Sequence, residues 1–195
     1  MREQEAPVGS DSVSSRRLSR NSKRNIRDVV IILVVAVLFG FAIRIFVFQS
    51  FFIPTGSMIP TLKVGNRVLV NELAYDFHPV HRGDIIVFKT PPNDSFNPAI
   101  KDLVKRVVGL PGDTITSING RLYVNGSPLS EPYLPSGTVT SGVSSQKIPP
   151  GELWVMGDNR GDSEDSRYFG PISEKLIVGR VFLRYWPLSS FKVFG

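Results

Sequence analysis

The sequence predicts an all-β domain of short, mostly antiparallel strands that follows a single N-terminal transmembrane helix. Four observations predict this arrangement. One long apolar run lies near the start of the chain, and the apolar residues after it alternate with polar ones in short segments. Turn residues, chiefly Gly, Pro and Asn, separate these segments. No long amphipathic helical pattern follows the apolar run.

Composition narrows the classes of protein before any motif is considered. The chain has 195 residues, which is enough for one domain of ordinary size. It contains no cysteine, and this excludes disulfides, thiolate nucleophiles and Cys-based metal sites. Its two histidines, His78 and His81, do not form an H-E-x-x-H motif, which argues against a His-ligated metal hydrolase.

Residues 1–27 are predicted to be a disordered tail, because they are rich in Ser, Arg, Asn and Glu and carry few large apolar side chains. Residues 1–28 hold seven Lys or Arg and four Asp or Glu, so half of the net charge of +6 lies there. A basic arm for nucleic acid is an alternative, but the next segment explains these charges better. The rest of the chain also lacks the uniform basicity of a nucleic-acid-binding domain, and we expect no nucleic-acid partner.

A transmembrane anchor is predicted over residues 28–49. Within it, residues 29–48 contain only one charge, Arg44, and as a helix they span about 30 Å, the thickness of a hydrocarbon core. Six Lys or Arg lie in the 13 residues before the span. The positive-inside rule therefore predicts a cytoplasmic N-terminus, an extracytoplasmic domain over residues 50–195, and residence in the cell membrane.

Two other interpretations of the apolar run are weaker. A buried core helix does not account for 15 uninterrupted apolar residues, 29–43, behind a basic tail. A cleaved signal peptide needs a shorter apolar region followed by small residues at a cleavage site, whereas residues 45–52 are mostly bulky. These flanks favour a retained anchor.

Short segments with a period of two, typical of strands, occupy the chain after residue 53. The predicted strands are 67–71, 84–89, 103–108, 114–118, 121–124, 152–156 and 176–185. Asn119-Gly120 predicts a two-residue hairpin, and Asn125-Gly126 marks a further turn. Residues 127–149 are rich in Ser, Gly and Pro and are predicted to form a surface loop.

Ser57 is the first candidate for chemistry. It follows Gly56 in the segment 54–61 (PTGSMIPT), where two prolines restrict the backbone on either side. Such a turn can expose a hydroxyl and hold its backbone N–H in one direction. Taken alone, the pattern favours an ordinary Pro/Gly loop, because Gly-Ser is common.

A nucleophilic serine needs a base, and the sequence offers histidine or lysine. His78 and His81 lie in a turn-like stretch with no evident carboxylate to orient them, which favours surface histidines. A free lysine is neutral in only about one molecule in 2,500 at pH 7, a handicap of about 4.6 kcal/mol. Desolvation in an apolar site lowers the pKa of a lysine and removes much of this handicap.

Lys105 fits this requirement best among the lysines. It shares one face of a predicted strand with Leu103 and Val107, so apolar side chains flank it. Lys89 and Lys101 lie at strand ends, where solvation is better. A snorkelling lysine on an exposed strand is an equally good interpretation of this pattern alone.

A dense polar segment, residues 157–170, follows the strand at 152–156. A calcium loop does not fit, because Arg160 occupies a ligand position. A solvated turn is one interpretation. A hydrogen-bonded network is the other, in which Ser163 orients a lysine while Asp165 and Arg167 pair and hold the loop.

Together these segments resemble the bacterial type I signal peptidases, a family of Ser/Lys proteases. Five blocks occur in one order after a membrane span, which is far more specific than any single block. The blocks are 54–62, 65–68, 82–88, 105–113 and 157–170. The resemblance covers roughly residues 29–188. The short stretch between residues 113 and 157 implies that the large accessory subdomain of some members is absent.

The resemblance implies that Ser57 is the nucleophile and Lys105 the general base of a membrane-bound serine endopeptidase. The backbone N–H of Ser57 and the hydroxyl of Thr55 would form the oxyanion hole. Ser163 would position the lysine. Thr55 stands where the family often has serine, and the hydroxyl is retained in a side chain with stiffer rotamers.

The remaining implications of the resemblance concern the loop and the partners. Asp165 and Arg167 match the pair that holds the loop in the family, and Asn66 stands where the family often has Asp. The implied partners are the signal peptides of exported preproteins and the lipid bilayer, with no metal and no cofactor.

A self-cleaving Ser/Lys regulator and a membrane-tethered peptide-binding adaptor are the alternatives. The regulators carry a DNA-binding helical module where this chain carries a membrane anchor. An adaptor does not explain the presence of Ser57, Lys105 and Ser163 together.

The aromatic residues after the anchor allow two interpretations. Phe46, Phe48, Phe51 and Phe52 extend apolar surface from the anchor towards Ser57. They either dip into the membrane interface or simply complete the helix and the core.

Overall fold

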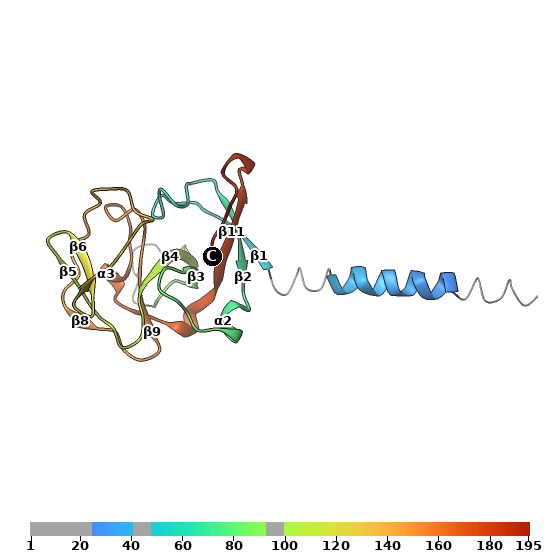
Figure 1. The fold of residues 1–195 in the computed structure, drawn as a ribbon, viewed down its shortest axis with the longest axis horizontal. Helices are drawn as coiled ribbons and strands as arrows, with labels where there is room; N and C mark the ends of the chain where they lie inside the picture. Colours follow the sequence, from blue (N-terminus) through green and yellow to red (C-terminus); the bar gives the residue numbers. More distant parts are fainter. Residues whose placement is uncertain (1–24, 41–47, 93–99) are drawn as a thin grey trace, which may run out of the picture. The chain divides into compact units, whose positions relative to one another are not determined.

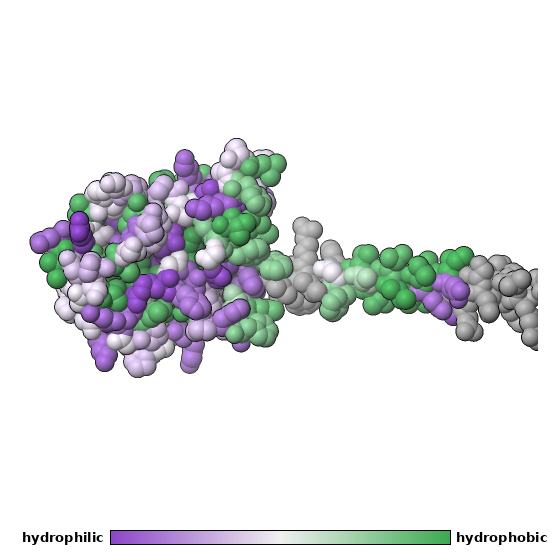
Figure 2. All heavy atoms as spheres, in the orientation of Figure 1, coloured by the Kyte–Doolittle hydropathy of each residue, from purple (hydrophilic) through white to green (hydrophobic). Residues whose placement is uncertain are grey.

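The computed structural model describes residues 25–40, 48–92 and 100–195 (Figure 1). The chain divides into two compact units, residues 1–45 and residues 46–195. In the first unit, residues 25–40 form a helix. Its apolar side chains are exposed along its length (Figure 2). Within the described ranges, no helix has both the length and the apolarity needed to cross a membrane.

The predicted tail and anchor fall partly outside this description. Residues 1–24 of the predicted tail and 41–47 of the predicted anchor are not among the described residues. The last two residues of the predicted anchor, Phe48 and Gln49, belong instead to strand β1 (Phe48–Phe52), which pairs with β2 (Arg67–Asn71). The apolar run therefore reaches into the second unit, because bulky aromatic residues serve a strand as well as a helix end.

The second unit is built from two antiparallel sheets, which confirms the predicted all-β class for this part of the chain (Figure 1). The larger sheet runs in the order β1, β2, β11 (Ile177–Trp186), β3 (Ile85–Lys89), β4 (Asp102–Gly109), β9 (Glu152–Met156) and β10 (Ile172–Ser173), with β12 (Lys192–Val193) paired to β11. The smaller sheet runs in the order β7 (Ser127–Pro128), β6 (Arg121–Val124), β5 (Thr114–Ile118) and β8 (Gln146–Lys147).

The seven predicted strands are confirmed, with bounds that differ by at most one residue. Strands β1, β7, β8, β10 and β12 were not predicted. All but β1 have two residues, too few to show a period of two. Short helical segments also join the strands. They are α2 (Ala74–Phe77), α3 (Ser166–Phe169) and the 3₁₀ turns η1 (Glu174–Leu176) and η2 (Leu188–Ser190).

The predicted hairpin lies between β5 and β6. Asn119 and Gly120 have φ of 49° and 78°, and Asn125 and Gly126, after β6, have φ of 53° and 79°. Both central residues of a type I′ turn need positive φ, which Asn and Gly adopt readily. The local turn chemistry therefore fixes the register of the smaller sheet.

Three clusters of buried apolar residues form the core of this unit. One of them contains Val108 and Trp154 from the larger sheet and Ile115 from the smaller one, and it joins the two sheets. Val143 and Ile148 pack into the same cluster. The prediction that residues 127–149 form a surface loop is therefore wrong in part, because this polar-rich stretch supplies two core side chains.

The aromatic residues before Ser57 differ in burial, and contact with the membrane interface stays a prediction. Phe51 packs against a core cluster, whereas Phe52 on the same strand is 58% exposed. Phe48 is also exposed. Phe46 lies outside the described residues.

Candidate active site

Ser57 lies in the turn segment between β1 and β2, and apolar residues of this segment pack into the core. Its neighbour Met58 is 1% exposed, and Met58 and Leu62 belong to the same buried cluster as Ile53. A backbone hydrogen bond of 2.8 Å from Leu62 N–H to Met58 O closes the turn after the serine. Burial of Met58 therefore fixes the backbone while Ser57 stays half-buried.

Lys105 lies in the middle of β4 and meets Ser57 directly. Its Nζ is 2.7 Å from Ser57 Oγ, a hydrogen bond between residues 48 apart in the chain. Lys105 is 3% exposed, and the fully buried Ile86 of β3 lies opposite it in the register. The core-facing interpretation of this strand position is therefore correct, and the snorkelling one is wrong.

Thr55 places a second hydroxyl near that of Ser57. Its Oγ1 lies 3.5 Å from Ser57 Oγ, and the residue is exposed. The structure thus brings three of the predicted residues, Thr55, Ser57 and Lys105, to one point.

A groove of about 350 Å³ begins at Ser57 and Lys105. Its walls are residues from 51–58 and from 100–105, and most of them are apolar. Strand β3 pairs with β4 over Asp102–Arg106, whereas β9 pairs with β4 only from Arg106 onward. Along the groove, one edge of β4 thus has no strand partner among the described residues. This edge has the geometry to bind an extended peptide by main-chain hydrogen bonds.

The polar segment after β9 is held together by one carboxylate. Asp165 is fully buried, and its two oxygens accept hydrogen bonds of 2.8 and 3.0 Å from the guanidinium of Arg167. The same carboxylate accepts from Gly157 N–H at 3.1 Å, and Arg167 donates to Ser163 O at 3.2 Å. The pairing expected from the sequence is present, and it ties both ends of the segment 157–167 together.

Ser163 lies beside the turn that carries Ser57, and its buried hydroxyl makes no hydrogen bond among the described residues. A methyl group placed on Gly157 would lie 2.2 Å from Ser163 Oγ and 2.4 Å from Ser57 O. Ser163 and the Ser57 carbonyl therefore both press against the bare Cα of Gly157.

The comparisons with known proteins agree on one family. The family model described as signal peptidase, peptidase S26, matches residues 26–186. A signal peptidase I from Bacillus caldolyticus is 42% identical over 170 residues, which cover 80% of this chain and 90% of that protein. The chain belongs to the signal peptidase I family. Its members are serine peptidases, so the resemblance found in the five motif blocks is confirmed.

Two further signal peptidases extend the comparison. A signal peptidase IB from Staphylococcus aureus is 39% identical over 187 residues, covering 87% of this chain and 94% of that protein. A solved structure of a signal peptidase I from Enterococcus faecalis is 32% identical, with a TM-score of 0.43, over 53% of this chain and 97% of that chain.

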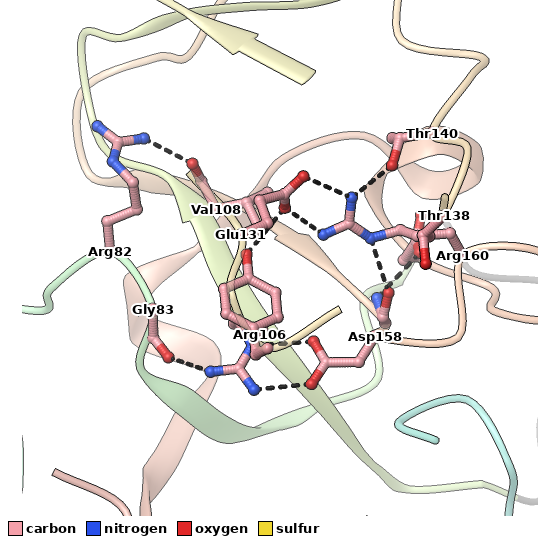
Figure 3. Close-up of polar contacts among 12 residues, drawn as sticks. Arg82, Gly83, Arg106, Val108, Glu131, Thr138, Thr140, Asp158 and Arg160 are labelled. Carbon is pink, nitrogen blue, oxygen red and sulfur yellow. Dashed lines mark hydrogen bonds and ion pairs between the residues drawn. The ribbon is translucent and has the colours of Figure 1, made fainter. Parts of the chain in front are cut away.

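Sequence reasoning missed a buried polar cluster next to Lys105 in this signal peptidase domain (Figure 3). The guanidinium of Arg106 donates to both carboxylate oxygens of Asp158, at 2.9 and 2.7 Å, and to Gly83 O at 2.7 Å. The ring of Tyr133 covers Arg106, with its centroid 3.8 Å from Cζ. Burial, and then the charge of Glu131, raise the pKa of Tyr133. The tyrosine therefore stays neutral over Arg106.

A second buried pair holds the segment 127–149 against the polar segment (Figure 3). Arg160 donates to Glu131 and to Thr140 Oγ1, the latter at 2.6 Å. Burial alone would lower the pKa of Arg160, but the hydrogen bond and the charge of Glu131 raise it. No local pattern could pair these residues, because 29 positions separate Glu131 from Arg160.

The histidines have contacts away from Ser57. His78 Nδ1 lies 2.7 Å from Ala74 O, at the end of α2. His81 is exposed, and its Nδ1 is 4.0 Å from Asp84. These contacts agree with the interpretation of both as surface histidines. The departure from the family at Asn66 is also accommodated locally, because its Oδ1 accepts from Lys63 N–H at 2.9 Å.

Proposed function

We propose that this protein removes the N-terminal signal peptides of exported preproteins, with Ser57 as nucleophile and Lys105 as general base. The observation that carries this proposal is the 2.7 Å contact between Ser57 Oγ and Lys105 Nζ. Membership of the signal peptidase I family supports the substrate class.

The base works because its amine is kept out of water. Lys105 is 3% exposed, and removal from water disfavours the charged form of an amine. The neutral Nζ takes the proton from Ser57 Oγ as this oxygen attacks the scissile carbonyl. The C–N bond of the tetrahedral intermediate then breaks, and the protonated amine gives its proton to the leaving nitrogen.

The oxyanion of the intermediate is held by two donors, the backbone N–H of Ser57 and the hydroxyl of Thr55. One donor of this kind is worth about 2.7–4 kcal/mol in the barrier. Water then attacks the acyl-enzyme with Lys105 again as base, which releases Ser57 and the second product. No step requires a metal or a cofactor.

Ser163 and the Asp165–Arg167 pair support the base. Ser163 Oγ is buried beside the nucleophile turn, and we assign it the role of positioning the Lys105 amine when substrate is bound. The Asp165–Arg167 pair holds the backbone of Ser163, because Arg167 donates to Ser163 O. A pair of this kind fixes geometry more than it adds stability.

The substrate binds along the groove as an extended strand. The edge of β4 over residues 102–104, which has no strand partner among the described residues, supplies main-chain hydrogen bonds to it. The apolar groove wall, which includes Phe51, Ile53 and Val104, accepts small apolar side chains before the cut.

The membrane topology completes the proposal. A cytoplasmic tail over residues 1–27 precedes an anchor over residues 28–47, and the domain from Phe48 to Gly195, which begins with β1, lies outside the cell membrane. The apolar exterior of the helix at residues 25–40 and the basic residues before it support this arrangement. The lipid bilayer is then a partner that brings the site to emerging signal peptides.

Cleavage of an added preprotein in detergent tests this function. Ser57→Ala and Lys105→Met are each expected to abolish product formation while the melting temperature stays near that of the wild type. Methionine fills the space of the buried lysine stem without its amine. Lys89→Ala is the control, because this lysine lies at the exposed end of β3.

Each other outcome contradicts a stated part of the proposal. Substantial cleavage by Ser57→Ala would remove the nucleophile assignment. Cleavage of the chain itself, with no cleavage of the preprotein, would indicate a self-processing regulator. Binding of the preprotein without cutting by the wild type would indicate a peptide-binding adaptor.

A further inference from the structure

We propose that Asn159 is a positioning residue of the oxyanion hole, which it serves by fixing the peptide group that carries the N–H of Ser57. This inference rests on the proposed function, because it assigns a support to one of its two oxyanion donors. Nothing in the sequence pattern singled out Asn159, which lies in the polar segment after β9.

Asn159 binds the two carbonyls on either side of Ser57. Its side-chain Nδ2 donates to Gly56 O at 3.1 Å, and its backbone N–H donates to Ser57 O at 2.9 Å. The side-chain bond joins residues 103 positions apart. One residue of the polar segment therefore holds both peptide groups of the nucleophile.

The bond to Gly56 O determines where the Ser57 N–H points. Gly56 C=O and Ser57 N–H belong to one peptide group, and this peptide is trans. In a planar trans peptide the C=O and N–H bonds point in opposite directions. Asn159 on the carbonyl side therefore directs the Ser57 N–H away from the polar segment. A hydrogen bond to the carbonyl also polarises the peptide and strengthens its N–H as a donor.

The Gly56–Ser57 peptide depends on a contact from outside the turn for its orientation, because it follows a glycine. Gly56 has no side chain to limit rotation of the adjoining peptide plane. Within the turn, Ile59 N–H also donates to Gly56 O at 3.1 Å, so the carbonyl has a partner without Asn159. The Asn159 bond is thus not required to satisfy a buried group, and its effect is on orientation.

The backbone around Asn159 is held in place by neighbouring contacts. The next residue, Arg160, is anchored in the buried contacts with Glu131 and Thr140 (Figure 3). Arg160 Nε also donates to Gly157 O at 3.0 Å, and Asp162 N–H donates to Asn159 O at 2.9 Å. Two neighbouring side chains thus bind different parts of the domain. Asn159 binds the turn that carries Ser57, and Arg160 binds the segment 127–149.

The test measures kcat and KM for preprotein cleavage by the full-length chain in detergent. Asn159→Ala removes the amide, and Asn159→Asp keeps its shape but removes the donor. Both are expected to lower kcat by at least about tenfold, and by less than the 1,000-fold upper range for loss of a whole oxyanion donor. KM should stay within about twofold, because the hole is engaged only in the transition state.

Asn125→Ala is the matched control. The Asn125 side chain makes two hydrogen bonds, accepting from Thr114 N–H and donating to Asp113 Oδ1, but it lies in the turn after β6, in the smaller sheet's part of the domain. Its left-handed backbone makes the alanine variant destabilising. This variant is expected to lower the melting temperature with an unchanged kcat, which separates positioning from general stability.

A peptide aldehyde gives a second readout that a purely structural role would not change. Its carbonyl adds to Ser57 Oγ and places an oxyanion in the hole, whereas the corresponding peptide amide binds the groove only. Asn159→Ala should weaken binding of the aldehyde in proportion to the loss of kcat, and it should leave the affinity for the amide unchanged.

The outcomes separate this inference from the proposed function. Full kcat in both Asn159 variants, with Ser57→Ala inactive, overturns the positioning role and leaves the function intact. A loss confined to KM, or an equal loss for aldehyde and amide, also overturns it. Cleavage that survives Ser57→Ala overturns the proposed function itself.

Discussion

Gly157 has no room for any side chain, because two groups of the site occupy the space beside its Cα. A methyl group there would lie 2.2 Å from Ser163 Oγ and 2.4 Å from Ser57 O. Real Cβ atoms do not approach other atoms so closely, and the Ser57 carbonyl belongs to the backbone and cannot swing aside. At the scale of one residue, the close approach of the Ser57 turn to the polar segment depends on the absence of a Cβ at Gly157.

Gly157→Ala is therefore expected to lower kcat by about 100-fold, the order of loss that a misplacement of 1 Å causes. The measurement is preprotein cleavage alongside the melting temperature. Gly161→Ala in the same segment is the control, since nothing lies within 4 Å of its added methyl group. Equal activity of the two variants would show that the turn can move away.

The sequence allowed several single residues of the site to be predicted. Ser57, Lys105, Asp165 and Arg167 stand out because their side chains are reactive or charged, whereas Thr55 was added by the family resemblance. The contributions of Asn159 and Glu131 could not be predicted. Each depends on a partner more than 25 positions away, and no local pattern records such a contact.

At the scale of elements, the turn between β4 and β5 depends on one carboxylate. Asp113 Oδ2 accepts from Arg82 at 2.8 Å and from Leu110 N–H at 2.7 Å, and Oδ1 accepts from Asn125 at 2.7 Å. Burial alone would raise the pKa of Asp113, but these hydrogen bonds and the charge of Arg82 together lower it. The ionised carboxylate thus links the two sheets.

A lowered pKa makes this link dependent on pH. Asp113 contributes stability above its ordinary pKa of 3.8, and this contribution is lost as the pH falls through the lower folded value. Asp113→Asn should therefore melt below the wild type at pH 7, and the difference should shrink as the pH falls below about 4. Thermal melts of both proteins from pH 7 to pH 3 test this. A constant difference would show that the charge is not linked to folding.

Strands were predictable where they alternate over four or more residues, as in β2, β5 and β6. The segment 127–149 was harder, because its composition is that of a loop while Val143 and Ile148 serve the core. Strand β1 was hidden for another reason. Its aromatic residues continue the apolar run, and hydrophobicity alone does not tell a helix end from a strand.

At the scale of the whole molecule, the boundary between the two units matters for any soluble fragment. Strand β1 begins at Phe48, inside the predicted anchor, and pairs with β2 along its full length. A fragment of residues 46–195 should fold and cleave a peptide substrate but no longer sediment with lipid vesicles. A fragment starting at residue 53 lacks β1 and should melt at a lower temperature.

Melting curves and vesicle sedimentation of both fragments and the full chain check this. Vesicles of neutral and anionic lipid separate insertion of the anchor from attraction of the basic tail. Sedimentation of the fragment 46–195 to the same extent as the full chain would contradict the role of the anchor. Equal melting temperatures of the two fragments would contradict the role of β1.

Strand β11 lies between β2 and β3, although it is one of the last elements of the chain (Figure 1). It therefore joins β1 and β2, the strands on either side of Ser57 in the chain, to β3 and β4, the last of which carries Lys105. While the polypeptide is still being synthesised and ends before residue 177, this connecting strand is missing, and no strand pairing links the two parts of the sheet among the described residues. From this order of strands we expect the complete sheet, and with it the assembled site, only when synthesis is nearly finished.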